Sequence, residues 1–242
     1  MILSRLHPIE EAVRSRPREI EWVLVDSGRR DRRVEELARL CREQRVPLRY
    51  GQRPALDRLA RDHQGAVARL AVREYLPEEE AFSGERGRRL LLVLDGVEDP
   101  QNLGAVLRIA EGAGAAVAVP ERGSAPLSDA VSRSSAGAVE RVPVIRIGNV
   151  RRFLDRAKEQ GFRVIGLDPA GTDLYSIDLT GDLALVLGAE GRGIRRLVRE
   201  GCDLLGRLPM KGKLASLNVA AAAAVAAYEA VRQRDFSGSA VD

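Results

Sequence analysis

Cysteine and histidine are scarce in this chain of 242 residues, which holds two of each. Cys41 and Cys202 lie far apart and near no histidine, a pattern that fits neither a disulfide framework nor a zinc site. His7 and His63 are too few to build a histidine-rich catalytic metal centre. We therefore expect reduced thiols, a cytoplasmic location and chemistry that proceeds without a metal ion.

Long apolar runs are also missing. The longest, Val219–Tyr228, has about half of the roughly 20 residues that a membrane span requires. No basic-then-apolar leader with a small-residue cleavage site opens the sequence, so we expect neither secretion nor a membrane partner. Apolar residues make up 45% of the chain and charged residues 31%, which is the composition of a folded globular protein.

Lysine is rare, since 36 of the 39 basic residues are arginine. The net charge of +4 is unevenly spread: residues 1–74 carry +5, residues 75–88 carry −2 and residues 89–242 carry +1. A genome rich in G and C accounts for arginine in place of lysine throughout, but it explains this asymmetry less well. Because arginine binds phosphate in a fork and stacks on bases, we expect the first third of the chain to bind nucleic acid.

The first third of the chain alternates between strand and helix patterns. Ile20–Asp26 (IEWVLVD) is a short apolar run typical of a strand, and Arg32–Gln44 has the apolar spacing of a helix. Similar patterns predict helices at His7–Arg16 and Pro54–Asp62 and strands at Val46–Tyr50 and Gly65–Val72. Leu76–Arg89 has no periodicity and mixes proline, glycine and charge, which indicates a linker. We therefore predict a small α/β domain over residues 1–75, a linker over 76–89 and a second domain over 90–242.

The second domain repeats this alternation on a larger scale. Its predicted strands are Leu90–Leu94, Ala115–Pro120, Val142–Ile147, Phe162–Leu167, Leu183–Gly188 and Leu204–Leu208. Its predicted helices are Asn102–Gly112, Leu127–Glu140, Val150–Glu159, Ile194–Glu200 and Ser216 to about Arg234. Such alternation predicts a parallel sheet with helices on both faces, whose ligands bind at the carboxyl ends of the strands. The loops after Leu94, Leu187 and Leu208 are therefore the candidate functional loops.

Two of these loops carry isolated polar groups. The first (DGVEDPQN) ends at Asn102, in the position of a helix N-cap, and Arg108 follows about two turns later. Taken alone, this loop is better explained as a capped helix with a solvated arginine. The second, Gly188–Gly193 (GAEGRG), presents Glu190 between glycines that allow a ligand to approach the backbone closely. Its spacing is neither a dinucleotide fingerprint nor a phosphate-binding P-loop, and a plain strand-to-helix turn is the alternative.

The third loop (LPMKGKLASLNV) places Ser216 and Asn218 at the start of an alanine-rich helix. Helix capping and close helix packing explain these residues when the loop is considered alone. The three loops occur in order, however, and each follows a strand. It is this combination, and not any single loop, that indicates a catalytic domain.

With all three loops in place, the sequence resembles the SpoU family of RNA ribose 2′-O-methyltransferases. The matching segments, within residues 89–234, are DGVEDPQNLGAVLRIAEGAGAAVAVP, SSAGAVERVPVIRI, LALVLGAEGRGIRRLV and LPMKGKLASLNVAAAAAVAAYEAVRQR. The resemblance implies an α/β protein whose C-terminal methyltransferase domain combines a parallel sheet with a deep trefoil knot. It also implies a homodimer that uses S-adenosylmethionine as cofactor and no metal.

The site residues of the family fall on this chain where its motifs match. The resemblance implies cofactor binding by Gly188, Leu208, Leu217, Glu190, Met210 and Ser216. It implies catalytic roles for Asn102, Arg108, Glu190, Ser216 and Asn218 around a ribose 2′-hydroxyl that must lose its proton. Family precedent makes Arg108 the base, whereas a guanidinium pKa above about 12 favours positioning and charge stabilisation instead. Glu190 is the alternative base.

The N-terminal segments HPIEEAVRSRP and HQGAVARL resemble the RNA-binding domain of one branch of the family. That branch methylates a guanosine ribose of 23S ribosomal RNA, and its small domain is similar to ribosomal proteins that bind kinked RNA. The chain departs from the branch at Arg5–His7, where the family usually has a glycine before the helix. Transfer RNA is the alternative substrate. A non-catalytic RNA-binding factor in ribosome assembly is the alternative function, although it has no chemical reason to keep the polar residues of all three loops.

Overall fold

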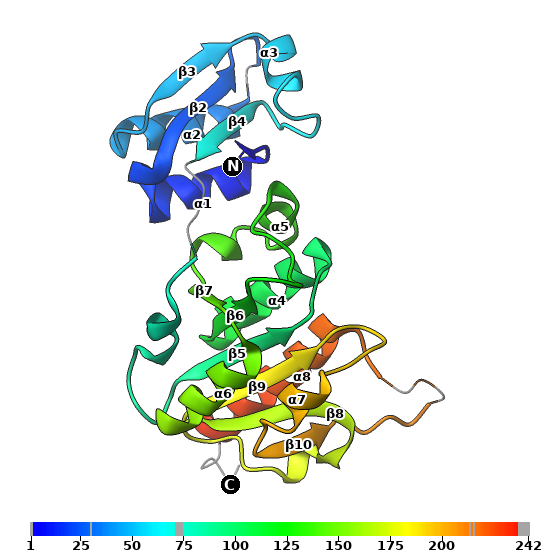
Figure 1. The fold of residues 1–242 in the computed structure, drawn as a ribbon. Helices are drawn as coiled ribbons and strands as arrows, with labels where there is room; N and C mark the ends of the chain where they lie inside the picture. The colour runs from blue at the N-terminus through cyan, green and yellow to red at the C-terminus, as the bar shows by residue number, and fades with distance from the viewer. Residues whose placement is uncertain (1, 30, 71–74, 213, 215, 237–242) are drawn as a thin grey trace, which may run out of the picture. The chain divides into compact units, whose positions relative to one another are not determined.

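The computed structural model describes residues 2–29, 31–70, 75–212, 214 and 216–236, with the side chains at positions 18 and 129 left out. The chain forms two compact units (Figure 1). Unit 1 comprises residues 1–74 and 126–141, and unit 2 comprises residues 75–125 and 142–242. None of the helices in the described ranges has both the length and the hydropathy that crossing a membrane demands.

Unit 1 is built on a four-stranded sheet with the order β1-β4-β2-β3. β2 and β3 run parallel, whereas β4 is antiparallel to β2 and to β1. The predicted alternation of strands and helices is confirmed, and the predicted strand end at Val72 lies outside the described residues. The strands are β1 (Ile2–Leu3), β2 (Ile20–Asp26), β3 (Leu48–Gly51) and β4 (Ala66–Leu70). The helices are α1 (Leu6–Ser15), η1 (Pro17–Glu19), α2 (Arg32–Glu43) and α3 (Arg53–Asp57).

Two helices of unit 1 share one apolar core with the sheet. α1 buries Ile9 and Val13, and α2 buries Leu37 and Cys41, in the same cluster as Val23 of β2. Apolar residues that recur three and four positions apart form a stripe along each helix. That stripe is both what made the helices predictable and what holds them on the sheet.

Residues 126–141 belong to unit 1 although the chain on either side of them belongs to unit 2. They form α5 (Asp129–Ser134) and η3 (Ala138–Glu140) in place of the single helix predicted over Leu127–Glu140. The helix breaks because Ala136 and Gly137 have φ angles of 50° and 87°. Glu140 is buried and forms an ion pair with Arg16, whose side chain is 7% exposed. This buried pair joins the segment to the end of α1.

Unit 2 is built on a six-stranded sheet with the order β10-β8-β9-β5-β6-β7, and every neighbouring pair is parallel. The predicted parallel sheet is thereby confirmed. Its order reverses between β5 and β9, and such a reversal opens a crevice for ligands at the carboxyl ends of the strands. The strands are β5 (Leu90–Asp95), β6 (Ala116–Pro120), β7 (Val144–Ile147), β8 (Arg163–Asp173), β9 (Leu183–Gly188) and β10 (Leu204–Arg207).

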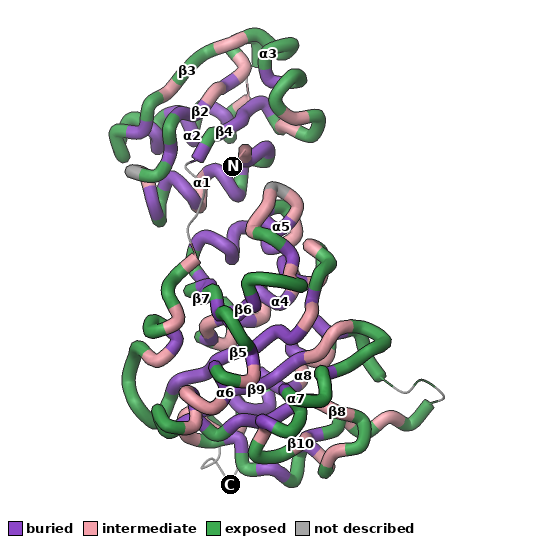
Figure 2. The backbone as a smooth tube through the Cα atoms, in the orientation of Figure 1, coloured by how far each residue is buried: buried purple, intermediate pink, exposed green. Residues whose placement is uncertain are grey.

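Helices cover both faces of this sheet (Figure 1). α4 (Pro100–Ala113) and α8 (Val219–Asp235) pack on each other and on one face. α6 (Val150–Glu159) and α7 (Arg196–Arg199) pack together on the other. Figure 2 shows the central strands β5 and β9 buried along their length. The alanines of α8, among them Ala223 and Ala227, are buried inside the unit, so they serve close packing within the chain.

The start of α4 differs from the prediction. The helix begins at Pro100, and its N-cap is Asp99, whose side chain accepts from the backbone N–H of Gln101 at 3.1 Å. The sequence predicted Asn102 as the cap of this helix, but Asn102 lies inside the helix. Proline is favoured in the first turn because its missing N–H would have no partner there. Because Asp99 caps the helix, the side chain of Asn102 is not needed as a cap.

The start of α8 also differs, by three residues. The predicted start was Ser216, whereas the helix begins at Val219 with Asn218 as its N-cap. The Asn218 side chain accepts from the N–H of Ala220 at 2.9 Å, which satisfies one of the unpaired donors at the helix end. Ser216 consequently lies in the extended approach to the helix.

The segment over residues 76–89, predicted to be a linker, folds onto unit 2. Leu76 forms a parallel bridge to Ile145 of β7, and the short helix η2 (Glu78–Phe82) follows. Phe82 stacks on Phe153 of α6 with the ring centroids 5.5 Å apart. The glutamates and glycines of this segment give it the composition of a linker. The aromatic ring of Phe82 nevertheless holds it on unit 2, because burying an aromatic side chain is favourable.

Candidate active site

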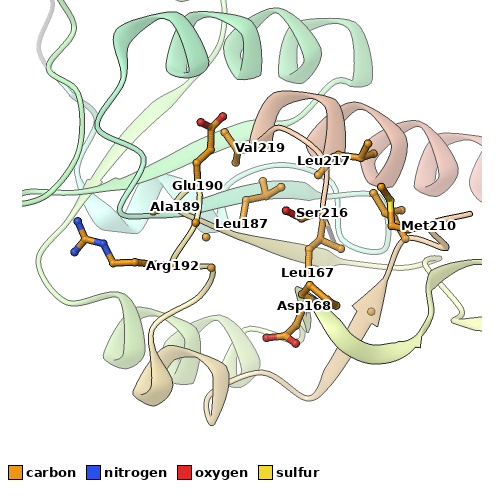
Figure 3. A pocket seen from close by; sticks show the side chains of 17 residues that line it. Leu167, Asp168, Leu187, Ala189, Glu190, Arg192, Met210, Ser216, Leu217 and Val219 are labelled. Atoms are coloured by element: carbon orange, nitrogen blue, oxygen red, sulfur yellow. The ribbon is translucent and has the colours of Figure 1, made fainter. Parts of the chain in front are cut away.

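A cavity of about 320 Å³ opens beside the middle of β8 and at the carboxyl ends of β9 and β10 (Figure 3). Polar groups reach it from the loop Gly188–Gly193 and from the side chains of Asp168, Glu190 and Ser216. Figure 3 shows Arg192 directed away from Met210 and Ser216. Apolar side chains from β8, from the ends of β9 and β10, and from the approach to α8 and its first residue form much of the lining: Leu167, Leu187, Leu208, Met210, Leu217 and Val219.

The glycine-rich loop after β9 doubles back on itself. The N–H of Gly193 donates to the carbonyl oxygen of Ala189 at 2.8 Å. A Cβ atom at Gly188 would lie 2.1 Å from the carbonyl carbon of Gly193 and 2.3 Å from the nitrogen of Ile194. Gly188 is therefore required because the chain passes against itself at this point. The sequence predicted that a ligand would occupy this space, whereas the loop's own backbone fills it.

Three side chains that are far apart in the sequence meet beside the cavity. Asn102 Nδ2 donates to Glu190 Oε1 at 3.1 Å. Asn218 Nδ2 donates to Asn102 Oδ1 at 2.8 Å and also to Glu190 Oε1. Glu190 Oε2 has no hydrogen-bond partner in the described part of the chain. α4, the glycine-rich loop and the cap of α8 thus contribute one polar group each to an Asn102–Glu190–Asn218 group.

The cap of α8 sets the orientation of this group. Asn218 Oδ1 accepts from the backbone N–H groups of Ala220 and Ala221, at 2.9 and 3.4 Å. Because the oxygen faces the helix, the amide nitrogen must face Glu190 and Asn102. The sequence reading of Asn218 as a cap and its role beside Glu190 are therefore two uses of one side chain.

A buried ion pair anchors the far end of the glycine-rich loop. Asp95 is the last residue of β5, and its side chain has 0% exposed surface. Its Oδ2 accepts from the backbone N–H of Arg195 at 2.8 Å, and its Oδ1 accepts from Arg195 Nε at 2.7 Å. The Arg195 side chain itself is 62% exposed. The pair joins the end of β5 to the residues that follow the cavity-lining loop.

Arg108 lies on α4, the helix that carries Asn102. Its side chain is exposed and has neither a hydrogen bond nor an ion pair with any described residue. The structure therefore does not bring Arg108 into the Asn102–Glu190–Asn218 group. A guanidinium without an internal partner keeps its donors available for a phosphate or carboxylate.

The structure gathers most of the residues that the sequence singled out. The residues predicted to bind cofactor all line the one cavity: Gly188, Leu208, Leu217, Glu190, Met210 and Ser216. Sequence reasoning missed Asp168, which also lines the cavity. The strand predicted to end at Leu167 continues to Asp173 as β8, so Asp168 lies within this strand and not in a loop after it. It also missed Asp95 and Arg195, since a single aspartate and a single arginine 100 positions apart form no pattern.

Neither cysteine lines this cavity. Burial raises the pKa of the Cys41 thiol to about 11 and that of the Cys202 thiol to about 11. Thiols with such values stay protonated near neutral pH and react slowly as nucleophiles. Across the ranges that the structure covers, no group of three His, Cys, Asp or Glu side chains is arranged to hold a metal ion.

Known families match both parts of the chain. The family described as "SpoU rRNA Methylase family" matches residues 89–228. The family described as "RNA 2'-O ribose methyltransferase substrate binding" matches residues 6–76. The first region covers most of unit 2 together with residues 126–141 of unit 1, and the second covers most of the rest of unit 1.

Relatives match along nearly the whole chain. The chain is 42% identical over 235 residues to the 23S rRNA (guanosine-2'-O-)-methyltransferase RlmB of Pseudomonas syringae pv. tomato, which covers 95% of this chain and 94% of that protein. It is 43% identical over 239 residues to the RlmB of a Burkholderia species, covering 96% of both proteins. Both matches therefore span the two units of this chain.

Solved structures agree with the fold. The SpoU methyltransferase AviRb from Streptomyces viridochromogenes, in complex with the cofactor AdoMet, matches with a TM-score of 0.81 at 25% identity. That match covers 96% of this chain and 89% of AviRb. The A. aeolicus TrmH/SpoU tRNA modifying enzyme matches with a TM-score of 0.57 at 25% identity, covering 66% of this chain and 82% of that one. About a third of this chain thus has no counterpart in the second structure.

Proposed function

The chain belongs to the SpoU rRNA methylase family, and on this premise we propose that it methylates the ribose 2′-hydroxyl of a guanosine in 23S ribosomal RNA, with S-adenosylmethionine as methyl donor. The observation that carries the proposal is the meeting of Asn102, Glu190 and Asn218 beside the cavity at the strand ends. We assign methyl transfer to unit 2 and RNA binding to unit 1.

The cavity fits S-adenosylmethionine in its chemistry. Its leucine, methionine and valine side chains offer apolar contact for an adenine ring and a methionyl chain. The glycine-rich loop presents backbone N–H and C=O groups to the cavity with few intervening side chains. Asp168 and Glu190 supply carboxylates, which favour the positive charges of the cofactor. When bound, S-adenosylmethionine supplies a methyl group activated by the positive charge of its sulfur.

The residues of the chain must hold the ribose and accept its proton. Glu190 Oε1 is engaged by the amides of Asn102 and Asn218, which leaves Oε2 to accept the proton of the 2′-hydroxyl. The two amides keep the carboxylate in one orientation while this happens. Arg108 is a poor base because a guanidinium has a pKa above about 12. Its unpaired guanidinium binds the phosphate beside the ribose and stabilises the charge that develops on the 2′-oxygen.

The extent of the matches favours ribosomal RNA over transfer RNA as the substrate. The two RlmB relatives match 95% and 96% of the chain. The tRNA modifying enzyme matches 66% of it. The part of this chain that the tRNA modifying enzyme does not match is about the size of unit 1, in which residues 1–74 carry a net charge of +5. A basic RNA-binding unit of this kind suits a large folded RNA substrate.

We further propose a homodimer, a trefoil knot in the C-terminal domain and a cytoplasmic location. The likeness to AviRb over 96% of this chain supports the knot. Exposed apolar side chains just before α8 and in its middle support the dimer, since Leu217 is 40% exposed and Tyr228 is 50% exposed. Light scattering on the eluting peak of a gel-filtration column is expected to give twice the chain mass, and a monomer at micromolar concentration would exclude the dimer.

Calorimetry and a transfer assay together test the proposed activity. S-Adenosylmethionine is titrated into the full-length protein with and without a metal chelator, and methyl transfer to 23S rRNA is then measured with labelled cofactor. We expect chelator-independent binding and transfer. Glu190→Gln is expected to bind cofactor and to transfer slowly, whereas Glu200→Gln, an exposed neighbour paired with Arg196, is expected to behave as wild type. Absence of cofactor binding would contradict the proposal.

A further inference from the structure

We propose that a groove in unit 1, at the carboxyl ends of β2 and β3, binds a single-stranded segment of the substrate RNA. The groove is a cavity of about 710 Å³ lined by the loop Asp26–Arg29, by Gln52–Pro54 and by His63. The inference rests on the proposed function for the class of ligand, and it adds the place where that ligand binds. It also gives a physical role to the HQG motif at residues 63–65, which the active site leaves unused.

The first two residues of this motif hold the wall of the groove in place. The His63 side chain is 4% exposed. Its Nδ1 accepts from the backbone N–H of Gly65 at 3.2 Å, so Nε2 carries the proton and donates to Asp57 Oδ1 at 2.9 Å. Gln64 Oε1 accepts from the backbone N–H of Leu6 at 3.3 Å, at the start of α1. The motif is thereby tied to two helices.

The glycine of the motif makes room for Arg29. Gly65 has a φ of 94°, and a Cβ atom there would lie 2.8 Å from Arg29 Cδ. The arginine stem lies across the glycine, and its Nε and Nη2 donate to Asp31 Oδ2 at 3.1 and 2.8 Å. Arg29 Nη1 has no partner within the described ranges. A guanidinium fixed on one side with a free donor on the other is preorganised for a phosphate.

The rest of the groove offers a second cation and unpaired base-reading groups. The Arg53 side chain is 75% exposed, and its Nε lies 3.9 Å from Asp57 Oδ2. Asp26 Oδ1 accepts from the backbone N–H of Gly28 at 3.0 Å, whereas Oδ2 and the amide of Gln52 have no partner among the described residues. Acceptors and donors of this kind match base edges, which single-stranded RNA exposes and duplex RNA hides. Two arginines beside such groups therefore favour a single strand.

A second groove of unit 1 is less suited to RNA and provides a matched control. It is a cavity of about 300 Å³ lined by Trp22, Leu24, Arg49, Ala55, Arg58 and Leu59. Trp22 is 9% exposed, and the guanidinium of Arg49 lies 5.3 Å from its ring centroid, so the ring is already covered. Apart from its two arginines, this groove has no charged or amide side chain in its lining. It matches the first groove in cations and differs in base-reading groups.

Two double variants of the full-length protein compare the grooves. Arg29→Ala/Arg53→Ala and Arg49→Ala/Arg58→Ala are each titrated with a 23S rRNA transcript that the wild-type protein binds. We expect the first pair to raise the RNA Kd at least tenfold. The slope of the logarithm of the association constant against the logarithm of the salt concentration should become less steep by about 1.4, or about 0.7 for each lost phosphate contact. The second pair is expected to change the Kd less than twofold. Neither pair is expected to change the Kd for S-adenosylmethionine.

The outcomes separate this inference from the proposed function. Equal losses from both pairs would show that unit 1 attracts RNA by net charge alone, and a larger loss from Arg49→Ala/Arg58→Ala would place the RNA in the other groove. Either result overturns the inference while methyl transfer by the wild-type protein stands. If the wild-type protein binds the transcript through the first groove but transfers no methyl group, the inference holds and the proposed activity fails.

Discussion

The ion pair between Asp95 and Arg195 gives the sharpest prediction about the cofactor cavity. Asp95 ends β5, and Arg195 follows the loop that lines the cavity. We expect Arg195→Ala to loosen that loop at one end while Glu190 still holds it at the other. Binding of S-adenosylmethionine should therefore weaken although Arg195 itself does not line the cavity.

The magnitude follows from what the substitution leaves behind. The alanine variant keeps the backbone N–H that donates to Asp95 Oδ2 and loses the side-chain donors to Oδ1. Removing one partner of a buried ion pair costs about 3–5 kcal/mol. Because the Arg195 side chain is 62% exposed, solvent screening reduces this, and we expect about 2–3 kcal/mol. S-Adenosylmethionine binds the ordered loop, so the loss of binding free energy is at most this amount, which corresponds to a rise in the cofactor Kd of up to roughly 30- to 150-fold.

Calorimetric titration and urea unfolding followed by circular dichroism form the assay. Arg196→Ala is the matched control, because its exposed ion pair with Glu200 at 2.7 Å is worth only about 0.3–0.5 kcal/mol. The double variant Asp95→Asn/Arg195→Ala also removes the Asp95 charge that Arg195→Ala leaves without its partner. It should regain more of the lost unfolding free energy than of the lost cofactor affinity. Equal effects of Arg195→Ala and Arg196→Ala would refute the reasoning. A loss that appears only in unfolding, with cofactor affinity intact, would show that the pair does not order the loop.

Three further predictions concern other residues. Arg108→Ala should leave cofactor affinity unchanged, because Arg108 does not line the cavity, and should slow methyl transfer at least tenfold, or about 1.4 kcal/mol. Near-normal turnover in a folded variant would remove Arg108 from the site. Gly188→Ala should abolish cofactor binding, because its Cβ would lie 2.1 Å from the backbone of Gly193; Gly148→Ala, whose Cβ meets nothing within 4 Å, is the control, and equal calorimetric titrations would contradict this. For Asp182, burial raises the pKa, but hydrogen bonds from Arg89 and from the N–H groups of Gly87 and Arg89 outweigh it and hold the pKa below its usual range. This carboxyl therefore stabilises the fold above its unfolded pKa of about 4, and the stabilisation is lost as the pH falls through the lower pKa of the folded state. Asp182→Asn should flatten the decline of the unfolding free energy below about pH 4. An unchanged decline, measured by circular dichroism, would contradict this role of Asp182.

The positions of most strands along the chain and their parallel arrangement were predictable, because apolar runs report burial directly. β9 is found over Leu183–Gly188 as predicted, since its unbroken apolar run can only lie in the middle of a covered parallel sheet. The segment over residues 76–89 was not predictable, because its anchors, Leu76 and Phe82, lie among charged residues without a helical or strand period. The break in the helix predicted over Leu127–Glu140 depends on the φ angles of Ala136 and Gly137, which composition does not reveal.

The candidate site divides in the same way. The loops could be predicted because parallel strands bring the loops that follow them to one edge of the sheet. The residues themselves came from the resemblance to the SpoU family, and all of them line the cavity: Gly188, Leu208, Met210, Ser216 and Leu217. What joins the loops could not be predicted, since it depends on single side chains meeting across long separations. Asn102 was assigned as a cap because nothing in the sequence shows that Asp99 takes that role and frees the asparagine to reach Glu190.

Nucleoside analysis of the reaction product tests the central claim most directly. Purified full-length protein is incubated with S-adenosylmethionine and unmodified 23S rRNA, the RNA is digested to nucleosides, and the methylated species are identified by mass spectrometry. We expect a single new species, 2′-O-methylguanosine, which forms much more slowly in the Glu190→Gln reaction and is absent from a parallel reaction with transfer RNA. A methyl group on a base, a methylated ribose in transfer RNA alone, or no methylated nucleoside from a protein that binds the cofactor would contradict it.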